Sequence, residues 1–322
     1  MQNFLNILQS EIDIFIKNRL LYGYVAAFVS AVLVGSIYSV AKPILSSQIQ
    51  PLTLSSLIYL ISGIFMMCVT YGRERNKKKD ALKKDDYALL LIIGLLGACI
   101  APFLFFEGLN RTTASSASVL GGGELLFTVV FALLFFKERL TKIGYLGMSI
   151  TLIGITLISL SSENDAQNDL LNLNLNFGDI LIILSTVCWG LDNNLSKVIS
   201  KRTANTSKII YVKSLTGGII LLTCSFLLGY RVNLEISQIP YLLILGIGGF
   251  GLSLFFFIES LRIIGTLKVV VIFSSSTIFG LIFSVILLDE RIGTMQLIAT
   301  ALVVLGLYYV NKDELNYLKK TN

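Results

Sequence analysis

Residues 113–136 read TASSASVLGGGELLFTVVFALLFF, and this stretch decides the fold class. It carries one ionisable side chain, that of Glu124. A helix needs about 20 mainly apolar residues to cross the hydrocarbon core of a bilayer. The stretch is therefore predicted to be a membrane-spanning helix with an acidic residue midway along it.

The rest of the chain has the same apolar character. Of its 322 residues, 54% are hydrophobic and 14% are charged, whereas a soluble domain carries about 25% charged residues. The runs are too long and continuous for the alternating strands of a membrane barrel. The sequence predicts an all-α polytopic membrane protein with ten transmembrane helices, over residues 20–40, 51–71, 87–109, 113–136, 143–160, 178–197, 208–229, 241–260, 266–288 and 294–311.

The distribution of lysine and arginine predicts the orientation of the protein in the membrane. With the N-terminus placed inside, 21 of the 26 basic residues fall in cytoplasmic segments, which is the usual bias of membrane proteins. We therefore expect a multi-pass protein of the cell (inner or plasma) membrane with both termini in the cytoplasm. Outside the spans, the sequence predicts an amphipathic cytoplasmic segment over residues 1–19, a polar external linker over 161–177 and a cytoplasmic tail over 312–322.

The two halves of the chain, residues 20–160 and 178–311, repeat one another. Because each half has five predicted spans, the second copy must be inverted relative to the first. Inverted repeats around a midplane site are typical of secondary transporters. At an offset of 152 residues, Gly94, Gly97, Phe103, Glu107, Leu109, Glu138, Arg139 and Gly154 match Gly246, Gly249, Phe255, Glu259, Leu261, Glu290, Arg291 and Gly306; at an offset of 155, Gly35, Lys42 and Gly63 match Gly190, Lys197 and Gly218.

Several of these residues carry a family resemblance. The stretch from Thr113 to Leu120, then Glu124, then Lys137-Glu138-Arg139-Leu140-Thr141, resembles one repeat of the EamA-type transporters, which belong to the drug/metabolite transporter superfamily. The second half repeats the pattern through Asp289-Glu290-Arg291. The resemblance covers residues 20–311 and implies a transporter. It does not select among amino acids, other metabolites, nucleotide-sugars and drugs as substrates.

The sequence departs from this family in its fourth and ninth predicted helices. A proline is common there in the superfamily, and neither helix has one. The segments 121–123 (Gly-Gly-Gly) and 274–276 (Ser-Ser-Ser) are the places where the chain could bend instead.

Glu124 is the main candidate for substrate binding or proton coupling. It lies too deep in its span for its side chain to reach water, and acidic residues inside membranes usually mark transport pathways. The alternative is a structural hydrogen bond from a protonated carboxyl group. Its repeat partner is Ser276, which together with Ser275 completes this part of the predicted site.

Asp192 and Lys213 form the second part of the predicted site. They are equally distant from the loop that joins the sixth and seventh spans, so antiparallel helices would place them at one depth. We predict an ion pair, which could also serve only to lock two helices together. Trp189, Asn193 and Asn194 lie beside Asp192 in the sequence and are included as candidate binding residues.

Three further ionisable residues, Glu107, Glu259 and Arg262, are secondary candidates. Each glutamate has a basic residue one turn later, and local helix pairing is the simpler explanation. Glu138 and Glu290 are predicted to stabilise helix N-termini through the helix dipole.

The sequence thus predicts a secondary active transporter that exports a small amino-acid-like or zwitterionic metabolite by alternating access, with protons as a candidate coupling ion. Efflux of hydrophobic cations or drugs is the alternative. A membrane-embedded enzyme or a scaffold is the alternative of another class, and the chain has no histidine and no nucleophile motif to support an enzyme. We expect no cofactor, no metal and no nucleic-acid partner; the substrate and the bilayer are the expected partners.

Overall fold

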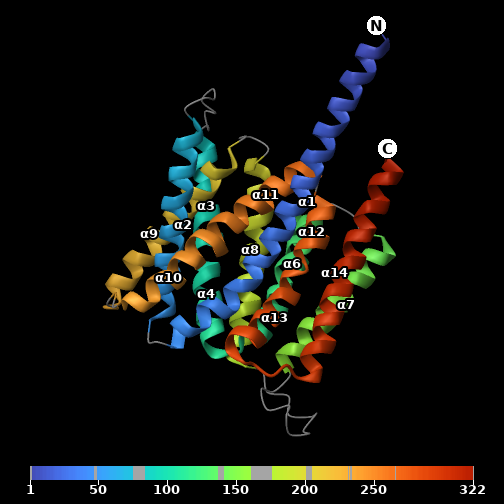
Figure 1. The fold of residues 1–322 in the computed structure, drawn as a ribbon. Helices are drawn as coiled ribbons and strands as arrows, with labels where there is room; N and C mark the ends of the chain where they lie inside the picture. The colour runs from blue at the N-terminus through green and yellow to red at the C-terminus, as the bar shows by residue number, and fades with distance from the viewer. Residues whose placement is uncertain are drawn as a thin grey trace.

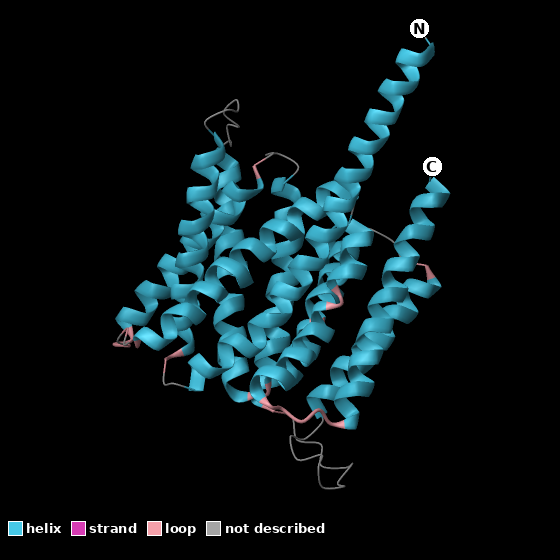
Figure 2. Ribbon diagram, viewed as in Figure 1, coloured by secondary structure: helices cyan, strands magenta, loops and turns pink. Residues whose placement is uncertain are grey.

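The computed structural model describes residues 2–46, 49–74, 84–136, 141–160, 176–200, 205–230, 232, 234–264 and 266–321. This part of the chain is helical, and Figure 2 shows the described helices and the short loops that join them. The α-helices are α1 (Gln2–Ser46), α2 (Pro51–Glu74), α3 (Lys84–Leu95), α4 (Ala101–Arg111), α5 (Ala114–Gly121), α6 (Gly123–Phe136), α7 (Lys142–Leu160), α8 (Phe177–Ser200), α9 (Thr206–Leu227), α10 (Ile239–Leu243), α11 (Ser253–Ile264), α12 (Thr266–Phe273), α13 (Ser276–Leu288) and α14 (Thr294–Thr321). Two π-helical segments, η1 (Leu96–Ile100) and η3 (Ile244–Leu252), and a short 3₁₀ turn, η2 (Ile236–Gln238), complete them.

These elements fall into ten transmembrane segments, which confirms the all-α polytopic fold. Seven segments of the described chain are long and apolar enough to cross a membrane by length and composition alone. The remaining three are α8, with Asp179 and Asp192 inside it, the bent pair α12–α13, and the apolar part of α14, Thr294–Val310.

The first helix is longer than predicted. α1 continues without a break from Gln2 to Ser46 and so extends beyond the span predicted over residues 20–40 at both ends. Pro43 lies within the last turn of α1, and the Nζ of Lys42 donates hydrogen bonds to the carbonyl oxygens of Leu109 and Thr112. The N-terminal part of α1 projects from the bundle (Figure 1). The location of residues 1–19 at the membrane surface stays a prediction.

The bends that replace the missing prolines lie where the small residues were noted. A turn at Gly122 separates α5 from α6, and a turn at Ser274-Ser275 separates α12 from α13. The two π-helical segments also occupy matching positions of the repeat. At the offset of 152 residues, η1 (96–100) corresponds to residues 248–252, which lie within η3. The irregular backbone therefore recurs in both halves of the chain.

The two halves run in opposite directions through the bundle. The end of α1 meets the end of α4 through Lys42, and the start of α8 meets the same end of α4, where Gly178 packs against Gly108. Both termini lie on one side of the molecule (Figure 1). The peripheral helices α7 and α14 lie side by side, with Gly147 packed on the backbone of Gly306, as small residues allow in membranes.

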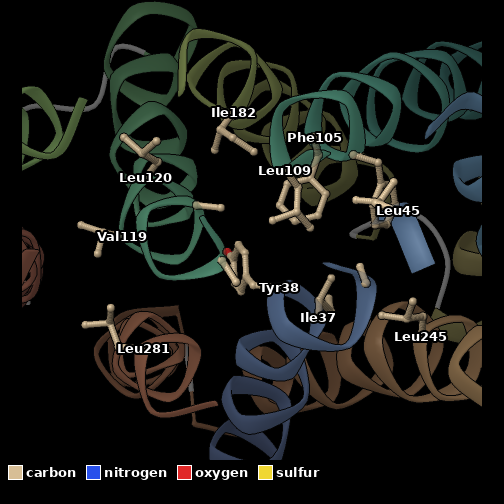
Figure 3. Packing of buried hydrophobic residues seen from close by; sticks show 14 of the residues in the cluster. Ile37, Tyr38, Leu45, Phe105, Leu109, Val119, Leu120, Ile182, Leu245 and Leu281 are labelled. Carbon is tan, nitrogen blue, oxygen red and sulfur yellow. The ribbon is translucent and has the colours of Figure 1, made fainter. Parts of the chain in front are cut away.

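The core lies between α1, α4 and α5 of the first half, and Ile182, Leu245 and Leu281 of the second half belong to the same cluster. Figure 3 shows Tyr38 of α1 between Phe105 of α4 and the α5 segment that carries Val119 and Leu120. The Tyr38 and Phe105 rings lie 5.5 Å apart, edge to face. This core forms the wall of a cavity.

Candidate functional site

A cavity of about 90 Å³ lies between the two halves of the bundle, with room for several water molecules. Both halves contribute to it, as a site between inverted repeats requires. Polar and aromatic side chains line the cavity together. The residues are Ser30, Val34, Ile37, Tyr38, Tyr59, Gly97, Phe105, Glu124, Trp189, Asp192, Asn193, Lys213, Ser214, Gly249, Phe250, Ser253, Leu254, Phe257 and Phe273.

Glu124 lines the cavity from the first turn of α6. The bend at Gly122 ends α5 and starts a new helix, so Glu124 lies in the first turn of α6, where the helix dipole favours a negative charge. Glu124 Oε1 accepts a hydrogen bond of 2.8 Å from Asn193 Nδ2. The same amide nitrogen donates to Thr128 Oγ1 at 3.2 Å. Asn193 thus holds the Glu124 carboxylate from α8.

Asp192 and Lys213 form the predicted ion pair. Lys213 Nζ lies 2.6 Å from Asp192 Oδ2, and the side chains are 7% and 3% exposed. Ser196 Oγ donates to the other carboxylate oxygen at 3.3 Å. A side chain at Gly97 would overlap the Asp192 carboxylate, so glycine at position 97 makes room for the pair. Both members of the pair line the cavity.

Four aromatic side chains line the cavity beside these charges, and we call them the aromatic wall: Tyr59, Phe105, Trp189 and Phe250. Trp189 lies 5.3 Å from Phe105, and Tyr59 lies 5.0 Å from Phe250, measured between ring centroids. Trp189 Nε1 donates to the Gly97 carbonyl at 3.0 Å, and the Tyr59 hydroxyl donates to the same carbonyl at 3.1 Å. Such a wall of π faces suits an apolar or positively charged solute.

Three of the predicted residues lie away from the cavity wall. Asn194 donates to the carbonyl oxygens of Thr128 and Gly190, both at 2.9 Å, and so joins α8 to α6. Ser275 Oγ donates to the Ile272 carbonyl within the turn between α12 and α13, and Ser276 packs against Gly35 of α1. In this conformation it is Phe273, at the end of α12, that lines the cavity from this region.

The secondary candidates form the local pairs that helical spacing predicted. Glu107 pairs with Arg111, and Glu259 Oε1 lies 3.4 Å from Arg262 Nη1. Neither glutamate lines the cavity as the structure describes it. Among the described residues, no three His, Cys, Asp or Glu side chains gather as a metal site would require.

The contributors to the cavity that sequence reasoning missed include Tyr38, Tyr59 and Gly97. The available signal was the position of both tyrosines deep inside apolar runs, since a buried phenol needs a hydrogen-bond partner. Tyr59 is 4% exposed. The partner could not be read from the sequence, because it is a backbone group.

Polar contacts close the bundle at the end opposite the termini. Glu290 Oε1 and Oε2 accept hydrogen bonds of 2.9 Å from the backbone N–H groups of Ala114 and Ser115, at the start of α5. Gln296 Nε2 donates to Ser115 Oγ and Ser116 Oγ at 3.2 and 3.1 Å. Glu290 therefore stabilises a helix N-terminus, as predicted, and it does so across the two halves. Its repeat partner Glu138 lies outside the described residues.

Comparison with known proteins identifies the family of this chain. The family model described as "EamA-like transporter family" matches residues 21–160 and 176–312. An uncharacterized transporter of Methanothermobacter thermautotrophicus is 32% identical over 300 residues, covering 90% of this chain and 86% of its own. The uncharacterized transporter YyaM of Bacillus subtilis is 27% identical, covering 71% and 74% of the two chains.

More distant matches extend the same likeness. Solute carrier family 35 member F6 of Mus musculus is 26% identical over 161 residues, covering 49% of this chain and 43% of its own. A crystal structure of a protein aligns with a TM-score of 0.64 and 17% identity, covering 89% of this chain and 95% of that one; it shows the likeness of the fold. With both halves matched by the family model, this chain belongs to the EamA-like transporter family, within the drug/metabolite transporter superfamily.

Proposed function

We propose that the protein is a secondary active transporter that exports a small organic solute by alternating access, with the cavity between its two halves as the substrate site. The observation that carries the proposal is the position of Glu124, which faces a cavity lined by both inverted repeats. Rocking of one repeat against the other would expose such a site to each side in turn.

Proton exchange at Glu124 is the coupling step that we propose. A carboxylate at this depth costs free energy unless it is paired or protonated. Its described contacts are neutral: Asn193 donates to Oε1. Binding of a proton or of a positively charged group would each neutralise Glu124, so the two would compete. That competition would couple export of the solute to entry of protons.

The charge balance favours a positively charged solute over the amino-acid-like zwitterion. Lys213 is already engaged by Asp192 at 2.6 Å, which leaves Glu124 as the unneutralised charge of the described cavity wall. The aromatic wall would add cation–π attraction, worth about 0.5–2 kcal/mol per contact. We therefore propose an organic amine or ammonium ion as the substrate class.

A zwitterionic, amino-acid-like substrate is the second candidate. It is supported by the exposure of both members of the Asp192–Lys213 pair to the cavity. A solute carboxylate would have to displace Asp192 from Lys213, and its ammonium group would bind Glu124.

The two candidates are separated by compounds that differ only in charge. Trp189 is the single tryptophan of the chain and lines the cavity, so its fluorescence reports binding there. We expect 2-phenylethylamine to change the emission of the purified protein and to be transported in proteoliposomes, L-phenylalanine to act more weakly, and 3-phenylpropanoate to have no effect. Isobutylamine, L-valine and 3-methylbutanoate repeat the test with smaller molecules.

The outcomes have distinct meanings. If L-phenylalanine and L-valine bind best and are transported, the second candidate replaces the first and the transporter proposal stands. If neither amine is transported and neither changes the emission, the amine proposal is wrong. Trp189→Phe is the control that removes the fluorescence signal while keeping an aromatic side chain.

A further inference from the structure

The carbonyl group of Gly97 is exceptional within its helix, because it bonds to side chains of the cavity wall. Residues 96–100 adopt π-helical geometry, in which the Ala101 N–H donates to the Leu96 carbonyl. In an α-helix that N–H would bond to Gly97 instead. The π-helical register moves it one residue back and leaves the Gly97 carbonyl without this donor.

The next donor in the π-helical register is missing as well. An i→i+5 bond to Gly97 would come from residue 102, and residue 102 is proline, which has no N–H. The Gly97 carbonyl thus lacks both backbone donors. It accepts hydrogen bonds from the Trp189 indole at 3.0 Å and from the Tyr59 hydroxyl at 3.1 Å instead.

The second half of the repeat lacks this arrangement. At the offset of 152 residues, Gly97 corresponds to Gly249 and Pro102 to Leu254, which has an N–H group. The Gly249 carbonyl accepts a hydrogen bond from the hydroxyl of Ser253 in its own helix. The two halves share the π-helical irregularity. Of the two corresponding carbonyl groups, that of Gly97 bonds to aromatic side chains of other helices, whereas that of Gly249 bonds within its own helix.

We propose that Pro102 is a positioning residue for the substrate cavity: by withholding a backbone donor from Gly97, it leaves a carbonyl that fixes the orientation of Trp189 and Tyr59. These residues come from α8 and α2, so one carbonyl joins three helices at the cavity wall. An aromatic wall held in this way presents a fixed surface to the solute, which reduces the ordering cost of binding. Pro102 itself is buried behind the wall.

The direct test is the indole N–H of Trp189 in ¹H–¹⁵N NMR spectra of the labelled protein in detergent. With a single tryptophan in the chain, the spectrum holds one indole cross-peak. Pro102→Ala restores an N–H that competes for the Gly97 carbonyl, so we expect the indole proton to move upfield and to exchange faster with solvent. Pro43→Ala, which removes the proline inside α1, is the matched control and should leave the cross-peak in place. An unchanged indole proton in folded Pro102→Ala would overturn the proposal.

A second measurement separates positioning from general damage to the helix. This step rests on the proposed function, because it uses 2-phenylethylamine as the probe of the cavity. Tyr59→Phe removes one donor and keeps the ring, and it should weaken binding by roughly 2- to 10-fold, the effect of losing one hydrogen bond. In the Pro102→Ala background the same change should have little further effect, because residues that share one interaction are not additive. Additive losses would contradict the proposal. The NMR result stands whichever solute the cavity accepts.

Discussion

At the scale of single residues, the main energetic feature is a charged pair enclosed in the membrane-spanning bundle. Asp192 and Lys213 are almost fully buried and 2.6 Å apart. Removing two charges from water is costly, and their attraction offsets that cost only while both are present. Gly97 takes part because any side chain there would overlap the Asp192 carboxylate. Asp192, Lys213 and Gly97 therefore form a unit of three residues on three helical elements.

Lys213→Ala should destabilise the protein by about 3–5 kcal/mol, the cost of leaving a buried charge without its partner. The double substitution Asp192→Asn with Lys213→Gln removes both charges and keeps hydrogen-bonding groups, so it should recover part of that loss. Thermal unfolding in detergent, at constant pH and lipid content, measures both. A double variant as unstable as the sum of the two single variants would mean that the residues do not act as partners.

At the scale of helical elements, the bend in the fourth span creates a second helix N-terminus within the membrane-spanning bundle. The fourth span is divided into α5 and α6, and each part has an acidic residue at its N-terminal end: Glu290 bonds to the first N–H groups of α5, and Glu124 lies in the first turn of α6. The first contact joins the two halves of the chain at the end opposite the termini. In the proposed alternating-access cycle, opening at this end would separate the loop before α14 from α5 and break the hydrogen bonds of Glu290.

Glu290→Gln should weaken this closure, because an amide has one acceptor oxygen where the carboxylate has two and carries no charge to interact with the helix dipole. In a background without the native cysteines, a thiol introduced at the buried Ser118 of α5 should then react faster with an impermeant maleimide added outside. Glu107→Gln is the matched control, since the ion pair of Glu107 among the described residues is with Arg111 on the same helix, α4. Equal labelling rates in all three proteins would show that Glu290 does not hold this end closed.

At the scale of the whole molecule, the sequence predicted the properties that depend on hydropathy and spacing. The ten spans, the Asp192–Lys213 pair, the pairing of Glu107 and the helix-capping role of Glu290 follow from run length, loop distance and helical periodicity. What it did not predict depends on backbone geometry. The π-helical turns could not be read from hydropathy, and the hydrogen bonds that the Gly97 carbonyl accepts and the positions of Ser275 and Ser276 away from the cavity wall depend on how the helices pack. That packing leaves no periodic pattern in a chain that is apolar on most sides.

The orientation in the membrane is a prediction of the same scale. The two termini lie on one side of the bundle (Figure 1), and the basic residues assign that side to the cytoplasm. A thiol introduced at Asn168 should be labelled by an impermeant reagent added to intact cells, whereas one at Lys78 should be labelled only after the membrane is opened. Labelling at Lys78 in intact cells would reverse or overturn the proposed topology.

The central claim, that Glu124 couples solute movement to protons, is tested most directly by transport in proteoliposomes containing the wild type or Glu124→Gln. The amide keeps the size of the side chain and removes its charge and its titration. With 2-phenylethylamine as the solute and an imposed pH gradient, we predict accumulation by the wild type, abolished when the gradient is collapsed, and none by a folded, correctly inserted Glu124→Gln protein. Gradient-driven accumulation by Glu124→Gln at the wild-type rate would contradict the account.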